Sequence, residues 1–92
     1  MRLLFSAHAV RRMFERQIGT AEVSQVIAEG LVIEERPNDL PYPSRLLLGF
    51  PGGRALHVLV SDDAAGDARH VVTLYEPDRS LWSDDFKRRR QP

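Results

Sequence analysis

The spacing of the apolar residues changes once along this chain, close to Leu31, and this change limits the folds that the chain can adopt. Before it, apolar residues recur at intervals of three and four, which is typical of amphipathic helices. After it, short apolar runs are separated by turn residues, which is typical of β-strands. A chain that forms helices first and strands afterwards is expected to be an α+β domain.

Two helices are expected in the first thirty residues. Ser6 is a suitable N-cap for a helix over residues 7–15, because its hydroxyl can accept a hydrogen bond from the first turn. The apolar face of this helix would hold Ala7, Val10, Met13 and Phe14. A turn follows this helix, and Gly19 is expected to end it by adopting the left-handed conformation. Thr20 would then cap a second helix over residues 21–29.

Four strands are expected after residue 30, at about 31–35, 45–50, 55–60 and 69–76. Their connections are short, which favours antiparallel pairing. We therefore expect two N-terminal helices packed on one face of a four-stranded antiparallel sheet, with the other face partly open to solvent. Residues 1–86 would form a single domain that ends in a short helical turn, and residues 87–92 a frayed basic C-terminal tail.

The charged residues are segregated along the chain. Residues 1–16 carry four arginines and one acid, and residues 79–92 carry five basic residues and two acids. Residues 17–78 carry four arginines and ten acids, so that the formal net charge of the whole chain is zero. If folding brings the two basic ends together, they would form one face able to hold an anion such as a phosphodiester backbone.

Composition excludes several kinds of site. The chain has no cysteine, which excludes disulfides, thiolate metal sites and a cysteine nucleophile. Its three histidines and dispersed carboxylates lack the spacing of zinc ligands, so we expect no metal and no cofactor. The apolar stretches are too short to span a membrane, and residues 1–5 are too short for a signal peptide. A cytoplasmic protein is the default expectation.

His8 is the first residue that could carry chemistry. It lies off the expected apolar face of the first helix, and Arg12 one turn later could share an anion with it. Two other interpretations remain open. The residues could belong to a solvated helix face with an arginine–glutamate pair, or His8 could have a structural role near the cap.

His57 and Tyr75 lie on strands that could be neighbours. A histidine in the middle of a strand is either satisfied by a hydrogen bond or points into a polar site, and its near-neutral pKa suits it to proton transfer. Tyr75 could pack with its hydroxyl bonded to the backbone, or present that hydroxyl beside His57. Trp82 is expected to cover the core rather than to stack on a base.

Taken together, these residues resemble a bacterial family, the domain of unknown function 4258, over nearly the whole chain. The resemblance starts with the segment Ser6-Ala7-His8-Ala9 and the residues Arg12, Met13 and Arg16. It continues with Ile18, Val23, Gly30, Pro41-Tyr42-Pro43, Leu56-His57-Val58, Thr73-Leu74-Tyr75-Glu76-Pro77-Asp78, Trp82, Arg88 and Arg89. Members of this family look like small relatives of the RelE-like toxins, with the fold expected above.

The resemblance implies the toxin half of a toxin–antitoxin pair. The expected activity is a metal-independent endoribonuclease acting on messenger RNA, with a cognate antitoxin protein as partner; dependence on the ribosome is left open. The alternative is a non-catalytic binding module, or a toxin that blocks a protein target, with the acidic middle of the chain facing the partner protein.

Cleavage of RNA without a metal needs a base, a cation beside the phosphorus and an acid. We expect His57 as the base or acid, with Tyr75 or His8 as its partner. Arg12 and Arg16 would hold the phosphate, assisted by Thr73, Arg88 and Arg89. The expectation for His57 depends on its surroundings, because full burial with a bond to the backbone would remove most of its support.

Overall fold

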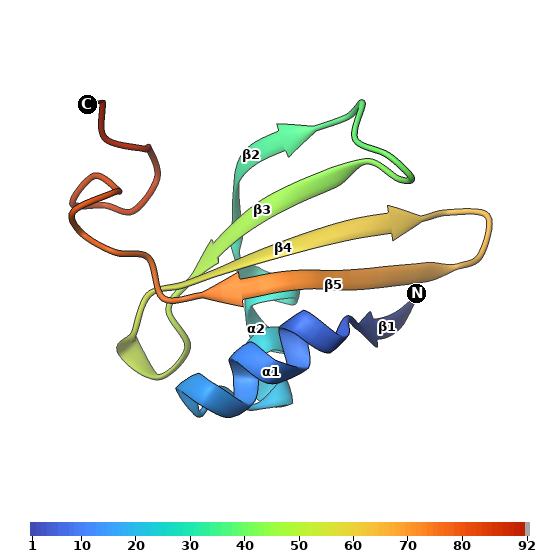
Figure 1. Cartoon of the computed structure of the whole chain (residues 1–92), viewed down its shortest axis with the longest axis horizontal. Helices are drawn as coiled ribbons and strands as arrows, with labels where there is room; N and C mark the ends of the chain where they lie inside the picture. The colour runs from blue at the N-terminus through green and yellow to red at the C-terminus, as the bar shows by residue number, and fades with distance from the viewer. Residues whose placement is uncertain (92) are drawn as a thin grey trace.

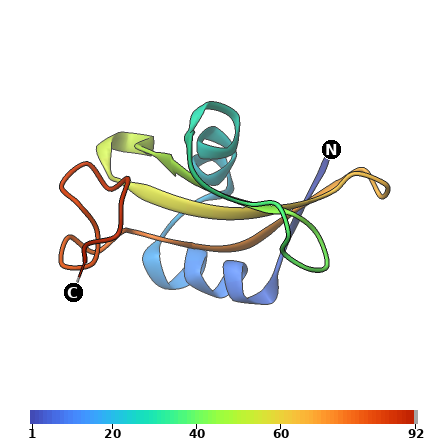
Figure 2. The same ribbon diagram turned by 90° about the horizontal axis from the view of Figure 1, so that it is seen from above.

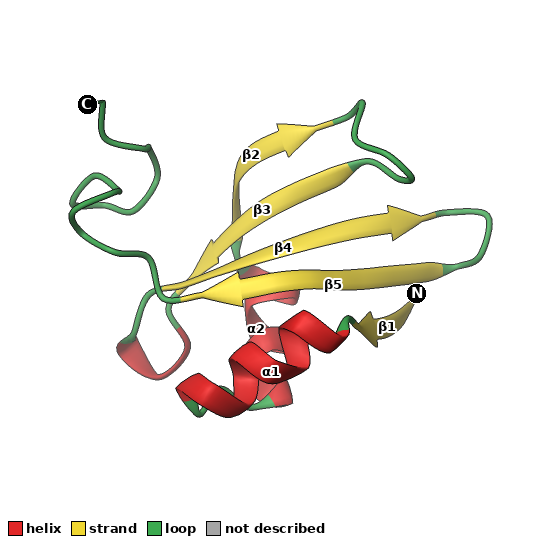
Figure 3. Ribbon diagram, in the orientation of Figure 1, coloured by secondary structure: helices red, strands yellow, loops and turns green. Residues whose placement is uncertain are grey.

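The computed structural model describes residues 1–91, which form two helices, five strands and one short 3₁₀ turn (Figure 1, Figure 3). In chain order these are β1 (Arg2–Phe5), α1 (Ala7–Arg16), α2 (Thr20–Glu29), β2 (Leu31–Arg36), β3 (Ser44–Gly49), η1 (Pro51–Gly53), β4 (Leu56–Asp63) and β5 (Ala68–Tyr75). The predicted α+β class is therefore confirmed, and both helices and four of the five strands lie close to the predicted ranges.

The sheet differs from the prediction by one strand. Its strand order is β1-β5-β4-β3-β2, with β1 parallel to β5 and all other neighbours antiparallel. The expectation of four antiparallel strands is therefore wrong, and the sheet is five-stranded and mixed. The additional strand has four residues, and Arg2 is paired with Ala68, which is 66 positions later in the chain. Local apolar spacing carries no information about such a distant pairing.

Helix α1 begins as predicted but buries a different face. The Ser6 hydroxyl accepts a hydrogen bond from the Ala9 amide at 2.9 Å, which confirms the N-cap. Ala9 is the buried residue of the helix, whereas Val10 and Phe14 are 53% and 87% exposed. The predicted apolar face is therefore wrong for these two. The helix contacts the sheet mainly through β5, next to the short edge strand β1, so that only a narrow side of it is covered.

The turn between the helices is capped by different residues from those predicted. Gln17, with φ of 55°, is the left-handed residue that ends α1, and Gly19 has an ordinary φ of −86°. Gly19 rather than Thr20 is the N-cap of α2, and its amide donates to the Glu22 carboxylate at 3.1 Å. The Glu22 carboxylate thus satisfies the amide of the N-cap residue, and the hydroxyl cap expected for the first turn of α2 is not formed.

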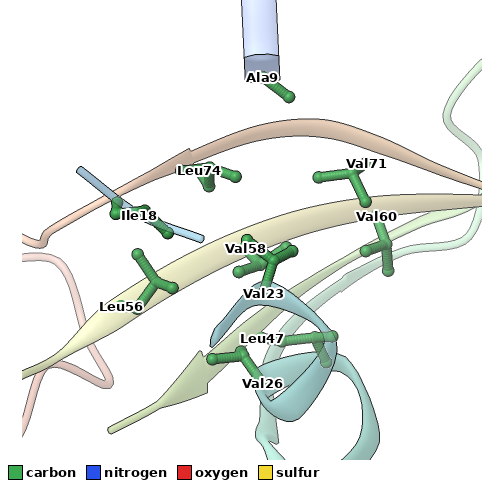
Figure 4. Close-up of a cluster of buried hydrophobic side chains, with 10 residues drawn as sticks. All are labelled: Ala9, Ile18, Val23, Val26, Leu47, Leu56, Val58, Val60, Val71 and Leu74. Carbon is green, nitrogen blue, oxygen red and sulfur yellow. The ribbon is translucent and has the colours of Figure 1, made fainter. Parts of the chain in front are cut away.

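One core lies between the helices and the sheet (Figure 4). Val23 and Val26 of α2 meet alternate residues of β3 and β4, and Ala9 of α1 meets β5. The buried members of this cluster are Ala9, Ile18, Val23, Val26, Leu47, Leu56, Val58, Val60, Val71 and Leu74. Because strand side chains alternate between faces, the residues next to these positions in β3 and β4 point to the other side of the sheet; in β5 the register shifts between Val71 and Thr73, so that Val71 and Leu74 both reach the core.

The other face of the sheet is covered at one end by residues 76–91, which we call the C-terminal strap (Figure 2). Trp82 and Phe86 of the strap are buried with Leu46 and Leu48 of β3. Two backbone hydrogen bonds of 2.8 Å fold the strap back on itself. One runs from the Ser83 amide to the Arg88 carbonyl, and the other from the Arg90 amide to the Leu81 carbonyl. Residues 81–86 therefore form no helical turn, and residues 87–91 fold back instead of fraying; residue 92 lies outside the described residues.

Candidate functional site

A cleft of about 430 Å³ lies where α1, the end of β5 and the C-terminal strap meet. It is lined by Arg12, Arg16, Thr73, Tyr75, Glu76, Asp78, Leu81 and Trp82. Four of the residues expected at the site, Arg12, Arg16, Thr73 and Tyr75, are thus brought together from two distant parts of the sequence.

The local structure explains why these four residues share the cleft. Arg12 and Arg16 are four residues apart on α1 and so lie one above the other on one side of the helix. Thr73 and Tyr75 are two residues apart on β5 and point to one face of the sheet. That is the face the strap covers, because Tyr75 packs with Trp82 and Phe86. The cleft therefore lies beside the strap.

His57 lies behind Tyr75 and is fully buried. The two residues are paired in register on β4 and β5, and the Nδ1 atom of His57 lies 3.2 Å from the Tyr75 hydroxyl oxygen. The Nε2 atom lies 2.8 Å from the carbonyl oxygen of Phe86 in the strap. Since a carbonyl only accepts, Nε2 carries a hydrogen, and in a neutral ring Nδ1 must accept the hydroxyl hydrogen of Tyr75.

Aromatic rings enclose the imidazole. The Trp82 ring stands at 87° to that of His57 with 4.4 Å between their centroids, and the Tyr75 ring at 69° with 5.2 Å. Trp82 is only 3% exposed, so the prediction that it covers the core is confirmed. His57 is thus both fully buried and bonded to a backbone carbonyl, and under these two conditions its direct catalytic role was expected to lose most of its support. RNA cannot contact it directly.

Burial controls the protonation of this pair. It lowers the pKa of His57 below its usual value, and this effect outweighs the Phe86 carbonyl and the Glu34 carboxylate, which raise it; Arg89 lowers it further. Burial also raises the pKa of the Tyr75 hydroxyl. At neutral pH the pair is therefore an uncharged phenol that donates to an uncharged imidazole.

The remaining expected residues lie outside the lining of the cleft. His8 is exposed on α1, one turn before Arg12. The guanidinium of Arg89 lies 4.7 Å from the centroid of the Trp82 ring and 3.9 Å from the Glu34 carboxylate. Arg88 belongs to the turn in which its amide donates to the Ser83 hydroxyl. None of these three residues lines the cleft, although the charge of Arg89 is near enough to Tyr75 to act on its pKa.

The two basic ends of the chain do not merge into one face. Arg2 donates to the Gly66 carbonyl at the far end of the sheet, and β1 and the strap lie on opposite sides of the molecule (Figure 1). Arg90 is bonded within the strap, to Asp84 at 2.8 Å. Only the second half of α1 and the first half of the strap flank the cleft, whose lining holds the two cations together with the carboxylates of Glu76 and Asp78.

Sequence reasoning missed Arg54, which lies beside the cleft. Its guanidinium donates to the Arg16 carbonyl at 3.3 Å and to the Gln17 carbonyl at 2.9 Å. It also bonds the carboxylates of Glu22 at 3.1 Å and Glu76 at 3.3 Å. Arg54 follows two glycines in a turn, and no spacing in the sequence sets it apart from the other arginines of the middle segment.

A second hollow, of about 460 Å³, lies between the end of α2 and the start of β2. Its walls are largely apolar and include Val26, Leu31, Leu48 and Phe50. Only Glu29 and Lys87 bring charge to it. It holds no histidine, tyrosine or arginine, so we place the candidate site in the cleft beside Tyr75.

Two kinds of feature are absent from residues 1–91. These residues contain no group of three or more histidines, aspartates or glutamates close enough to hold a metal ion. None of their helices has the length and apolar character needed to cross a membrane.

Residues 5–76 match the protein family described as Domain of unknown function (DUF4258). The match covers most of the chain, and the chain therefore belongs to this family. No match to this chain was found among the curated proteins or among the solved structures.

Proposed function

We propose that this member of the DUF4258 family is a RelE-like toxin of a toxin–antitoxin pair that binds messenger RNA in the cleft and cleaves it in the cytoplasm. The observation that carries the proposal is the convergence of Arg12, Arg16, Thr73 and Tyr75 in one cleft. The bond from Tyr75 to the buried His57 adds a group that can accept a proton.

Arg12 and Arg16 would bind the phosphodiester. A guanidinium offers several N–H donors in a planar fork that matches two phosphate oxygens. Two such groups one helical turn apart can hold one phosphate, or two successive phosphates of a single strand. The hydroxyl of Thr73, a residue in the lining of the cleft, would donate to a phosphate or ribose oxygen.

Tyr75 would be the catalytic residue and His57 the group that receives its proton. The 2′-hydroxyl oxygen attacks the adjacent phosphorus and passes its hydrogen to the Tyr75 oxygen, while the Tyr75 hydrogen moves to His57 Nδ1. The 2′-oxygen–phosphorus bond forms and the bond from phosphorus to the 5′-oxygen breaks. The leaving 5′-oxygen takes a proton from water, which gives a 2′,3′-cyclic phosphate and a 5′-hydroxyl. The hydroxide left from that water then takes a proton from the Tyr75 hydroxyl, Tyr75 takes back its own from His57 Nδ1, and both residues return to their neutral forms.

The two partners of His57 suit it to this role. A neutral imidazole can accept a proton at Nδ1, and burial keeps His57 neutral at pH 7. In the resulting imidazolium both N–H groups would have acceptors, the Phe86 carbonyl on one side and the Tyr75 oxygen on the other. Arg12 and Arg16 would stabilise the negative charge that grows on the phosphorane oxygens.

A second candidate function is binding without cleavage, either of RNA or of a protein target. It is favoured by the full burial of His57 and its bond to the Phe86 carbonyl, since a buried and fully bonded histidine is also what a purely structural role requires. In this case the same cleft would hold its ligand and Tyr75 would only pack.

Expression of the chain in a bacterial host, with mapping of RNA ends, separates these functions. Growth arrest together with new 5′-hydroxyl ends, both lost in Tyr75→Phe, would support cleavage. Arrest with intact messenger RNA would support the second function and contradict the first. No arrest by the folded wild-type protein would contradict the toxin proposal.

A further inference from the structure

We infer that Arg54 is a positioning residue for the cleft: it fixes the distance between the arginines of α1 and Tyr75, and it pairs with the Glu76 carboxylate that lines the cleft. The inference rests on the proposed function only for its RNA readout. Its structural basis is the set of four hydrogen bonds that one guanidinium makes to three elements.

The first part of the inference concerns the end of α1. The last carbonyls of a helix have no partner within the helix. Arg54 donates to two of them, at Arg16 and Gln17, and its positive charge suits the negative end of the helix dipole. Gln17 is also the left-handed residue at which α1 stops, so Arg54 holds the helix where its direction is set.

The second part concerns the end of β5. Glu76 directly follows Tyr75, and its Oε1 atom lies 3.3 Å from Arg54 Nη1, the same atom that lies 3.3 Å from the Arg16 carbonyl oxygen. A single nitrogen of Arg54 therefore bonds both the end of α1 and the residue that follows Tyr75. The other nitrogen, Nη2, ties in α2 through Glu22 at 3.1 Å. No other arginine among residues 1–91 joins three elements in this way.

The charge of Glu76 gives Arg54 its second role. Two arginines and two carboxylates line the cleft, so an unpaired Glu76 would repel the phosphate that Arg12 and Arg16 attract. The ion pair with Arg54, which Arg54 also makes with Glu22, offsets part of this repulsion without exposing Arg54 itself in the lining. Arg54 would therefore act on RNA affinity without touching RNA.

The test compares Arg54→Gln with a matched control, Arg45→Gln. The Arg45 side chain is equally exposed, at 33%, and its ion pair with Asp62 has the same 3.3 Å length as that of Arg54 with Glu76. Its partner lies at the opposite end of β4 from His57. Binding of a fluorescent single-stranded RNA is measured at several salt concentrations. We expect Arg54→Gln to weaken binding roughly tenfold, because an unpaired Glu76 then repels the phosphate, and Arg45→Gln to leave binding unchanged.

The salt dependence distinguishes positioning from direct binding of phosphate. Each phosphate of a single strand that a variant no longer neutralises reduces the slope of log K against log salt by about 0.7. We expect the slope of Arg54→Gln to equal that of the wild type. A slope lower by about 0.7 would show that Arg54 binds phosphate itself and would overturn the positioning role, as would unchanged affinity at every salt concentration.

A second measurement does not depend on RNA. The chain has no cysteine, so spin labels can be attached at Phe14→Cys on α1 and Leu81→Cys on the strap without interference. Both side chains are exposed, at 87% and 59%. We expect Arg54→Gln to broaden the distribution of distances between the labels, and Arg45→Gln to leave it narrow. If wild-type protein binds no RNA, the proposed function fails, and this distribution alone decides the inference: an unbroadened one overturns it.

Discussion

The Nδ1 atom of His57 lies 3.2 Å from the hydroxyl oxygen of Tyr75, and the two residues face each other across neighbouring strands. One of them is sealed inside the protein and the other lines a cleft. This relationship connects a buried base to the surface through one hydroxyl. The proposed reaction therefore depends on Tyr75 rather than on any direct contact of His57 with RNA.

Replacing the Tyr75 hydroxyl tests this connection. Tyr75→Phe leaves the buried Nδ1 atom of His57 without its donor, which should lower the free energy of unfolding by about 1–3 kcal/mol. The folded variant should retain RNA affinity and lose cleavage. Urea unfolding and a gel assay of RNA cleavage measure the two effects. Tyr42→Phe is the control, because Tyr42 stacks on His70 away from the cleft; equal loss of cleavage in both variants would refute the role of Tyr75.

The arginines of α1 should determine the salt dependence of binding. Arg12→Gln and Arg16→Gln should each weaken RNA binding roughly tenfold and reduce the salt slope by about 0.7. Fluorescence anisotropy across a salt series gives both numbers. Arg11→Gln is the matched control on the same helix, since Arg11 is exposed and does not line the cleft. A slope that falls equally in all three variants would indicate attraction by general charge and not a defined site.

Stability should depend on pH through His57. Folding lowers its pKa, so below the unfolded value of about 6.5 the unfolded chain binds a proton that the folded chain does not. The free energy of unfolding should therefore fall as pH drops below 6.5, by at most about 1.4 kcal/mol per pH unit, and be constant just above it. Urea unfolding between pH 5 and 8 measures this. His57→Gln should remove the fall and His8→Gln should keep it; an unchanged fall in His57→Gln would assign it to another group.

The strap should be part of the folded domain. Trp82→Ala removes a ring that is 3% exposed and covers His57, and should lower the free energy of unfolding by about 3–5 kcal/mol. It should also make His57 reactive toward diethyl pyrocarbonate, which mass spectrometry detects. Its neighbour Leu81, which is 59% exposed, is the control. If Trp82→Ala is as stable as Leu81→Ala, the strap does not contribute to the core.

Arg89 should stabilise the strap rather than bind RNA. It lies over the Trp82 ring and near Glu34, so Arg89→Gln should lower the free energy of unfolding by about 0.5–1 kcal/mol. The salt slope of RNA binding should stay the same. A slope reduced by about 0.7 would instead restore the RNA contact expected from the sequence.

The sequence predicts the parts of this fold that local spacing encodes. Ser6 as a cap and the strands containing His57 and Tyr75 follow from patterns within a few residues. The strand β1 does not, because its partner β5 lies more than sixty residues later in the chain. The exposure of Phe14 does not either, since it depends on how little of α1 the sheet reaches.

The candidate site is likewise predictable only where local spacing places its residues. Helical spacing places Arg12 and Arg16 together, and strand alternation places Thr73 with Tyr75, so each pair is predictable. That the two pairs share a cleft depends on Arg54, whose partners are spread over four other positions in the chain. Burial of His57 depends on the strap, whose aromatic residues give no sign in the sequence of the face they cover.

The chemistry of the RNA products tests the central claim most directly. Purified wild-type protein is incubated with a single-stranded RNA in the presence of EDTA, and the ends of the fragments are identified by mass spectrometry. The account predicts fragments with 2′,3′-cyclic phosphate and 5′-hydroxyl ends, absent with Tyr75→Phe and present with Tyr42→Phe. RNA that is bound in the cleft but stays intact, or is cut equally by Tyr75→Phe, would contradict it.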